Sequence, residues 1–98
     1  MIKNNRINDT GNVFLESITD FNNVSTSTMV QSNCMSITFI NKGDTIVTIN
    51  SLELAVNEKI EIVQLSAFID RTQYQVSFAS GGVNNNCVVI RTLPKNQS

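Results

Sequence analysis

The sequence predicts an all-β protein, a single small antiparallel β-sandwich of about six to eight strands with an Ig-like or jelly-roll-like arrangement. Isoleucine, valine and threonine supply 30 of the 98 residues, and their β-branched side chains suit a pleated sheet better than a helix. Turn-forming residues recur about every 8 to 12 residues, which is typical of the short strands of a sandwich. A chain of this length forms one domain with one core.

The first third of the chain gives the weakest strand signals. Residues 11–17 predict a first strand, although apolar residues occupy both parities there. Residues 18–33 are mostly polar, so we expect a connection that includes a short strand at residues 28–30.

A period of two becomes clear at residues 34–40, where Met35, Ile37 and Phe39 alternate with polar side chains. These three residues are therefore expected on one face of a strand. The following Asn-Lys-Gly-Asp predicts a hairpin turn, in which Gly43 supplies a positive φ.

The return strand of this hairpin places Val47 and Ile49 on one face, and a bend or bulge at Asn50-Ser51 separates it from a strand at Leu52–Leu54. Another turn at residues 55–58 leads to the next strand. In that strand Ile60 and Ile62 point inward, and the inward parity then shifts to Val63 and Leu65, as at a β-bulge or in a strand that is covered on both sides.

The last third alternates clearly in one strand and then shows a loop and a final strand. Residues 80–86 predict a flexible hairpin connection, and Pro94 ends the final strand because proline cannot donate to a ladder. A turn over residues 66–70 is the single candidate for helix. The inward side chains of the last two strands are expected to be Tyr74, Val76, Phe78, Val88 and Ile90. We divide the chain into an N-terminal arm (residues 1–12), a sandwich domain (13–93) and a C-terminal tail (94–98).

Charge and hydropathy argue against several partners. The formal net charge is −1 and the basic residues are scattered, so the basic stripe that nucleic-acid binding requires is missing. The apolar runs are too short for a membrane span, and none follows the basic start as in a signal peptide. We expect no nucleic-acid or membrane partner.

Two cysteines and the absence of histidine limit the chemistry of the chain. Cys34 and Cys87 are interpreted as two free thiols that act as small apolar residues, with a single disulfide as the alternative. No zinc motif is present, and we expect no metal and no cofactor.

No catalytic arrangement is recognisable in the sequence. Triads that use histidine are impossible, and G-x-S-x-G and S-x-x-K are absent. The acids are expected singly in turns or on outward faces, and the five phenylalanines are expected in the core. We therefore predict a protein that is not an enzyme and has no small-molecule substrate. The acids in question include Asp44, Glu53, Glu58 and Glu61.

The surface is unusually poor in charge. Charged residues make up 15% of the chain, and uncharged polar residues replace them, which lowers the cost of desolvation at an interface. A bias toward asparagine codons explains the same composition, so both interpretations stay open. Exposed edge strands and terminal arms can join neighbouring chains. The candidate interface residues are Ile2, Lys3, Asn4, Asn5, Arg6, Ile7, Asn84, Asn85 and Asn86.

The segment ITFINKGDTIVTINSLELAVNEKIEI, residues 37–62, resembles a pattern in small β-sandwich virion proteins of tailed bacteriophages. In that pattern, a strand, Asn-x-Gly, a strand rich in threonine, valine and isoleucine, and a leucine precede Pro-Gly-Glu and another strand. This chain has Ser51 where glycine is usual and Val56-Asn57 in place of Pro-Gly, while Glu58 matches. The likeness covers about a quarter of the chain and implies a structural component of a phage particle, with no catalytic residues.

These observations together predict a non-enzymatic structural virion protein, an auxiliary or decoration protein that cements neighbouring major capsid subunits. Its expected partners are other virion proteins, the major capsid protein first, or copies of itself. The alternatives are a tail, ring or fibre-anchoring phage subunit, and a carbohydrate- or receptor-binding module with exposed aromatic rings near residues 80–86. The expected location is the virion, after synthesis in the host cytoplasm without a signal peptide.

Overall fold

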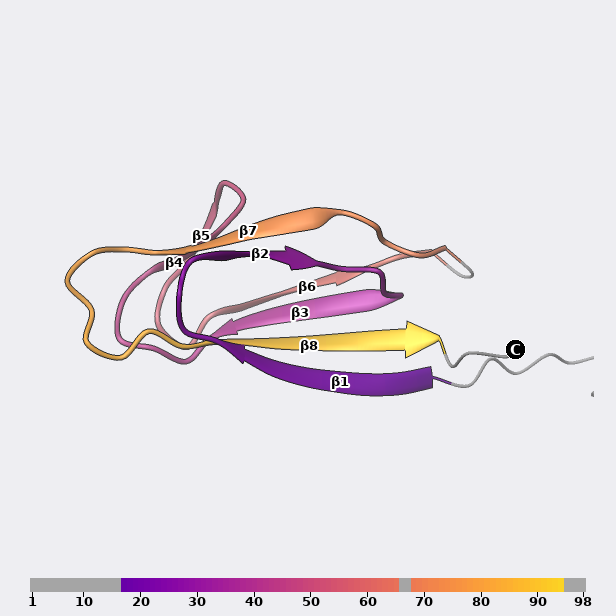
Figure 1. Cartoon of the computed structure of the whole chain (residues 1–98), viewed down its shortest axis with the longest axis horizontal. Helices are drawn as coiled ribbons and strands as arrows, with labels where there is room; N and C mark the ends of the chain where they lie inside the picture. Colours follow the sequence, from indigo (N-terminus) through magenta and orange to yellow (C-terminus); the bar gives the residue numbers. More distant parts are fainter. Residues whose placement is uncertain (1–16, 66–67, 95–98) are drawn as a thin grey trace, which may run out of the picture.

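The computed structural model describes residues 17–65 and 68–94, and this part of the chain contains eight strands and no helix (Figure 1). The strands vary in length from three residues in β4 and β5 to eight in β1 and β8. In chain order they are β1 (Ser17–Val24), β2 (Thr28–Gln31), β3 (Ser36–Asn41), β4 (Val47–Ile49), β5 (Leu52–Leu54), β6 (Lys59–Val63), β7 (Gln73–Phe78) and β8 (Cys87–Pro94).

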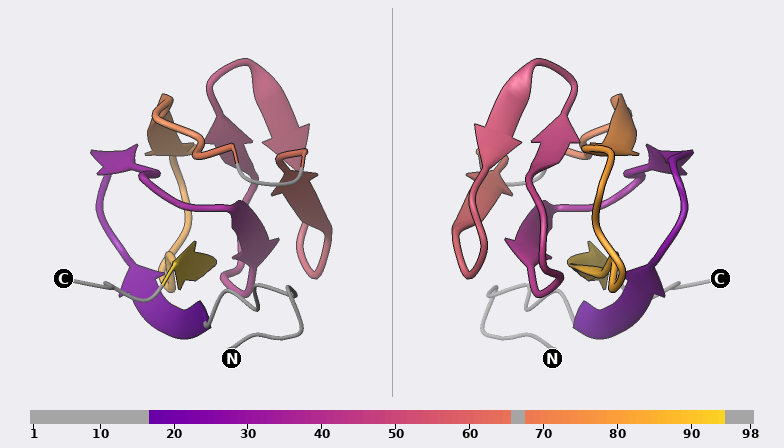
Figure 2. Two further views of the ribbon diagram at one scale, coloured as in Figure 1. Left: turned by 90° about the vertical axis from the view of Figure 1, so that its right-hand side faces the viewer. Right: turned by 90° about the vertical axis from the view of Figure 1, so that its left-hand side faces the viewer.

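The strands form two antiparallel sheets of four. Sheet A has the order β1-β8-β3-β6, and sheet B has the order β2-β7-β4-β5. The views along the strands show the two sheets as two layers, with the connections passing between them (Figure 2). This arrangement confirms the predicted all-β, sandwich-like fold.

The core lies between the inner faces of the two sheets. Ile37 and Phe39 of β3 are fully buried, as the period of two predicted. The inward residues expected in β4 and Tyr74 and Val76 of β7 are also buried, while Phe78 is partly buried and packs against the core. The buried apolar residues are Cys34, Ile37, Phe39, Val47, Ile49, Leu54, Tyr74, Val76, Cys87 and Val89.

Most connections cross from one sheet to the other, and this corrects two predicted hairpins. β3 lies in sheet A between β8 and β6, so both of its edges are occupied and β4 pairs instead with β5 and β7 in sheet B. β7 and β8 likewise lie in different sheets. The one tight hairpin among the described strands joins β4 to β5 through Asn50, whose φ is 55°, where the sequence predicted a bend or bulge.

Gly43 does not adopt the positive φ that the hairpin interpretation required. It is needed for close packing instead. A Cβ at this position would lie 2.5 Å from the backbone oxygen of Asn84 and 2.7 Å from the backbone nitrogen of Asn86. The residues after β3 therefore lie directly against the connection between β7 and β8, and only glycine permits that approach.

β1 occupies residues for which the sequence predicted a polar connection. Its pairing with β8 runs from Ser17–Pro94 to Val24–Cys87, and most of its side chains are exposed. An edge strand with one covered side needs little apolar alternation, so the pattern hid it. The strand predicted at residues 11–17 lies outside the described residues except for Ser17, which begins β1. The short strand at residues 28–30 is confirmed as part of β2.

The predicted inward parities of β6 and β8 need correction. Ile60 and Ile62 pack against the core, but β6 has no parity shift, and Val63 and Leu65 are exposed. In β8 the buried residues are Cys87 and Val89, so Val88 and Ile90 point outward. The error arose because consecutive apolar residues occupy both parities of β8.

Two phenylalanines expected in the core are exposed. Phe21 lies in β1, and Phe68 lies in the connection between β6 and β7, where its N–H donates to the Leu65 carbonyl oxygen. Phe39 is buried and Phe78 is partly buried, while Phe14 lies outside the described residues. The turn proposed over residues 66–70 includes two residues that the structure does not describe.

Candidate functional site

The outer face of sheet A carries apolar side chains on each of its four strands. The strand register places Phe21 opposite Ile90, and it places Ile40 opposite Val88. At the other edge of the sheet, Val63 lies opposite Ser36. Phe21 is 66% exposed and Val63 is 65% exposed. We define the apolar face as the outward side chains of Phe21, Ile40, Val63, Val88 and Ile90.

The outer face of sheet B is polar by contrast. Its register places Thr48 between Ser77 and Glu53, and glutamine side chains of β7 continue the row toward β2. Met29, which is 52% exposed, is its one large apolar side chain among the described strands. The two faces of the sandwich therefore differ in character, and only sheet A offers a surface that gains from being covered.

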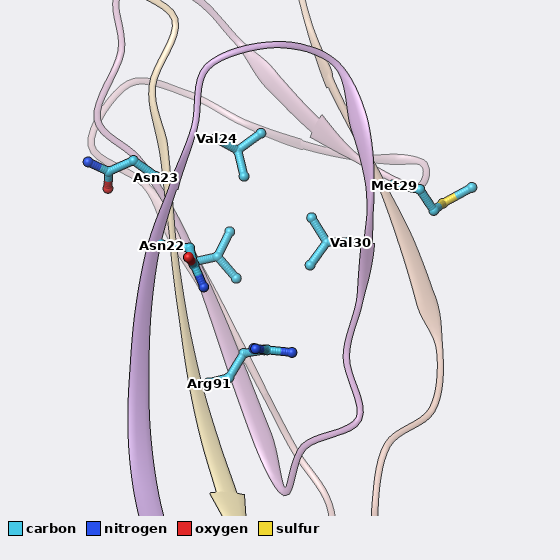
Figure 3. A pocket seen from close by; sticks show the side chains of 7 residues that line it. Asn22, Asn23, Val24, Met29, Val30 and Arg91 are labelled. Carbon is cyan, nitrogen blue, oxygen red and sulfur yellow. The ribbon is translucent and has the colours of Figure 1, made fainter.

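A hollow of about 310 Å³ lies between the sheets where β1 and β2 form their edges (Figure 3). Val24 of β1 and Val30 of β2 point toward each other across it, while Asn23 and Met29 point away. The inner face of β8 contributes the base of the hollow. The residues that line the hollow are Asn22, Asn23, Val24, Met29, Val30, Val89 and Arg91.

The Arg91 side chain at one end of this hollow is already occupied by partners from the chain. Its Nε and Nη2 atoms donate to the Asp20 carboxylate, with which it forms an ion pair. Its Nη1 donates to the carbonyl oxygens of Gln31 and Ser32, each at 3.1 Å. Because these contacts satisfy most of the guanidinium donors, the open part of the hollow suits an apolar group better than an anion.

A buried polar cluster lies where β2 leads into β3. The Asp70 carboxylate is 4% exposed and accepts hydrogen bonds from the Tyr74 hydroxyl at 2.6 Å and the Thr72 N–H at 2.8 Å. Burial by itself raises the pKa of Asp70, but the hydrogen bonds together lower the pKa by more than burial raises it. The pKa of Asp70 is therefore below its ordinary value of 3.8. Burial and the bond to Asp70 raise the pKa of Tyr74 to about 12. Ser32 Oγ lies 2.7 Å from the carbonyl oxygens of both Asp70 and Thr72.

The Asp70 cluster predicts loss of stability in acid. A folded-state pKa below 3.8 means that the unfolded chain binds more protons in this range, so the contribution of Asp70 is present above pH 3.8 and is lost as the pH falls through the folded-state pKa. Asp70→Asn should lower the free energy of unfolding at pH 7 by about 1 to 3 kcal/mol. It should also flatten the dependence on pH below about pH 4. Urea unfolding between pH 7 and pH 2 measures both effects, and an unchanged acid slope would contradict this account.

The loop that contains the candidate interface residues Asn84, Asn85 and Asn86 packs against the residues after β3. The Asp44 carboxylate accepts hydrogen bonds from the N–H groups of Val83 and Asn84, which lower the pKa of Asp44. Asn84 is exposed, the other two are partly buried, and the Asn85 Oδ1 is buried without a hydrogen-bond partner. The contacts of these asparagines therefore lie within the connection between β7 and β8 and with the residues after β3. Candidate residues 2–7 lie outside the described residues.

Cys34 and Cys87 are free and buried, which confirms their interpretation as apolar thiols. Burial raises the pKa of Cys87 to about 11. It also raises the pKa of Cys34, with a further contribution from Asp70. Both groups are therefore protonated near neutral pH and are poor nucleophiles.

The acids named from the sequence are exposed and do not converge. Asp44 and Glu58 lie in connections, while Glu53 and Glu61 point outward from β5 and β6. Within residues 17–65 and 68–94, no three histidine, cysteine, aspartate or glutamate side chains form a group able to hold a metal ion. The same residues include no helix with the length and apolar character of a membrane span.

No protein-family model, curated protein or solved structure matches the chain significantly. The assignment of a candidate site therefore depends on the sequence and structure of this chain alone. Sequence reasoning missed Phe21, Arg91 and Asp70 as notable residues. The doubled apolar parity of β8 was the signal for the apolar face, because a strand with apolar side chains on both sides has two surfaces to cover.

Proposed function

We propose that this chain is a non-enzymatic structural protein of a virion, an auxiliary protein that binds across neighbouring subunits of a capsid. The observation that carries the proposal is the difference between the two outer faces of the sandwich. Sheet A presents the apolar face, whereas sheet B presents threonine, serine, glutamine and glutamate. A subunit that binds a particle on one side and meets solvent on the other has this asymmetry.

The apolar face suits a broad, shallow contact. Its central residues, Ile40, Val88 and Ile90, are partly buried by their neighbours, whereas Phe21 and Val63 at the two edges are strongly exposed. Covering this face removes apolar surface from water and desolvates few charges. Among the residues that the structure describes in sheet A, Lys59 and Glu61 of β6 are the charged ones that point outward. Weak contacts of this kind become effective when many copies bind one particle.

The assignment to a virion draws on the resemblance of residues 37–62 to small phage virion proteins. Ile2, Lys3, Asn4, Asn5, Arg6 and Ile7 lie outside the described residues, and we propose them as an arm that adds contacts to a neighbouring subunit. Main-chain hydrogen bonds from such an arm supplement the apolar contact without requiring any single dominant residue.

Density-gradient sedimentation tests the proposal directly. In lysates of cells that produce the chain together with its natural assembly, the full-length protein should sediment with large particles at a fixed molar ratio to their major shell protein. A tail or ring subunit would instead appear at a small, fixed copy number per particle. Recovery only in the slowly sedimenting fraction, under conditions that preserve particles, would contradict the proposal.

A pair of charge substitutions tests the role of the apolar face. Val63→Glu places a carboxylate on the face, whereas Met29→Glu places the same charge at a similarly exposed apolar position on sheet B. We expect Val63→Glu to weaken particle binding at least about tenfold, because it buries an unpaired charge, and Met29→Glu to leave binding unchanged. Quantitative mass spectrometry of purified particles gives the ratio, and equal occupancy by both variants would contradict a role for this face.

A further inference from the structure

β1 is the longest edge strand of the sandwich, and no described residue pairs with its open side. The other edges, β2, β5 and β6, contain four, three and five residues. Exposed charges protect β5 and β6, which carry Glu53, Lys59 and Glu61. The single charge of β1 belongs to Asp20, which is paired with Arg91. β1 therefore lacks the protection that isolated edge strands usually have.

The register shows which backbone groups of β1 are free to bond. The Lys42 N–H donates to the Asn86 carbonyl oxygen, so these two residues form a hydrogen-bonded pair that continues the β3–β8 ladder. Such pairs recur at every second residue, and the even-numbered residues of β8 therefore bond to β3. The N–H and C=O groups of the odd-numbered residues of β8 point to β1. Their partners in β1 are its even-numbered residues. The N–H and C=O groups of Thr19, Phe21 and Asn23 consequently point to the open edge.

We propose that β1 pairs with β1 of a second copy of this chain, antiparallel about a two-fold axis at Phe21. The outward groups of Thr19 then bond to those of the partner's Asn23, and Phe21 bonds to the partner's Phe21. The two copies of sheet A become one continuous sheet. Such a contact is isologous, because each strand offers the same groups to the other.

Side-chain complementarity selects this register over its neighbours. Asp20 lies opposite the partner's Asn22, an amide that can donate to it, and the two Phe21 rings meet on the outer face. A shift by two residues in one direction would set Asp20 against the partner's Asp20, which like charge disfavours. The opposite shift would set Asp20 against the partner's Val24. A shift by one residue would exchange inner and outer faces.

The hollow between β1 and β2 supplies the second part of the argument. Ile18 has the inward parity of Asp20 and Val24, yet it is 50% exposed, because nothing described covers the open edge beside it. In the proposed register, Ile18 lies opposite the partner's Val24, which lines the hollow. This is a non-hydrogen-bonded pair, in which side chains approach most closely. Each copy therefore brings an exposed isoleucine beside Val24 at the hollow of the other.

This inference goes beyond the proposed function and does not depend on it. The apolar face test uses Val63 of β6, at the opposite edge of sheet A from β1. The dimer is measured with the isolated full-length chain, so failure of one proposal is distinguishable from failure of the other.

Sedimentation velocity from about 1 µM to about 1 mM measures the dimer. Thr19→Pro removes an N–H that faces the open edge and leaves the β1–β8 ladder intact, whereas Thr19→Val retains that N–H. We expect the native chain and Thr19→Val to dimerise with similar dissociation constants. Thr19→Pro should weaken the dimer at least about tenfold. A native chain that stays monomeric over this range overturns the inference.

Disulfide cross-linking tests the register and remains informative if Thr19→Pro does not fold. Paired residues in an antiparallel ladder have Cα atoms about 5.5 Å apart, within reach of a disulfide. Under mild oxidation, Phe21→Cys should form a covalent dimer. Thr19→Cys and Asn23→Cys should each stay monomeric alone and cross-link when mixed, and the native chain serves as the control for Cys34 and Cys87.

The outcomes that overturn the inference are specific. A dimer in which Phe21→Cys does not cross-link uses another surface, and a dimer that Thr19→Pro leaves unchanged does not use the β1 backbone. If the isolated chain stays monomeric and the β1 edge is covered only when a different protein is present, the occupant is that protein and not a second copy.

Discussion

Replacing Phe39 with alanine is expected to lower the free energy of unfolding by about 3 to 5 kcal/mol. Phe39 is fully buried in β3, between β8 and β6 in sheet A. Its ring meets the Tyr74 ring of sheet B edge to face, with centroids 5.3 Å apart and an interplanar angle of 62°. The substitution removes apolar burial, leaves a cavity and breaks an aromatic contact that joins the two sheets.

Urea denaturation monitored by circular dichroism measures this change. Phe21→Ala is the matched control, because it deletes the same ring from an exposed position. We expect the control to cost under about 1 kcal/mol in the isolated chain at concentrations where it is monomeric. Equal losses for the two variants would mean that Phe39 does not lie at the centre of the core.

The behaviour of Phe39 illustrates what the sequence could predict about the fold. Alternation identifies the face of a strand because side chains repeat every two residues, so Ile37, Phe39 and Tyr74 were placed correctly. Alternation says nothing about which strands are neighbours. β3 and β4 follow each other in the chain and are separated by turn-forming residues, yet the two strands lie in different sheets. A crossing between sheets and a hairpin use the same turn residues.

The candidate site was less accessible from sequence for the same reason. Val88 and Ile90 point outward only because the register of β8 with β3 and β1 fixes their parity. The ion pair of Arg91 with Asp20 joins residues 71 positions apart. Local sequence patterns, such as alternation within a strand, cannot predict a contact between residues so far apart. β1 itself has no regular alternation, since its inner face opens partly onto the hollow rather than onto the core.

Asn41 shows what determines the crossing from β3 into sheet B. Its side chain is fully buried and donates through Nδ2 to the carbonyl oxygens of Thr45, at 2.7 Å, and Leu54, at 2.9 Å. Its Oδ1 accepts a hydrogen bond from the Gly43 N–H at 3.0 Å. One amide therefore shapes the turn after β3 and also ties β3 of sheet A to β5 of sheet B.

Asn41→Ala should lower the free energy of unfolding by about 3 kcal/mol or more, because it leaves one buried N–H and two carbonyl oxygens without this partner.

Asn41→Asp tests whether hydrogen bonding or packing is responsible. The aspartate has nearly the same shape and can still accept from Gly43, but it places a carboxylate against the carbonyl oxygens of Thr45 and Leu54. We expect it to destabilise the chain at least as much as alanine does at pH 7. Asn84→Ala, at an exposed position, is the control. If Asn41→Asp has native stability in urea denaturation, the amide donor does not hold the two sheets together.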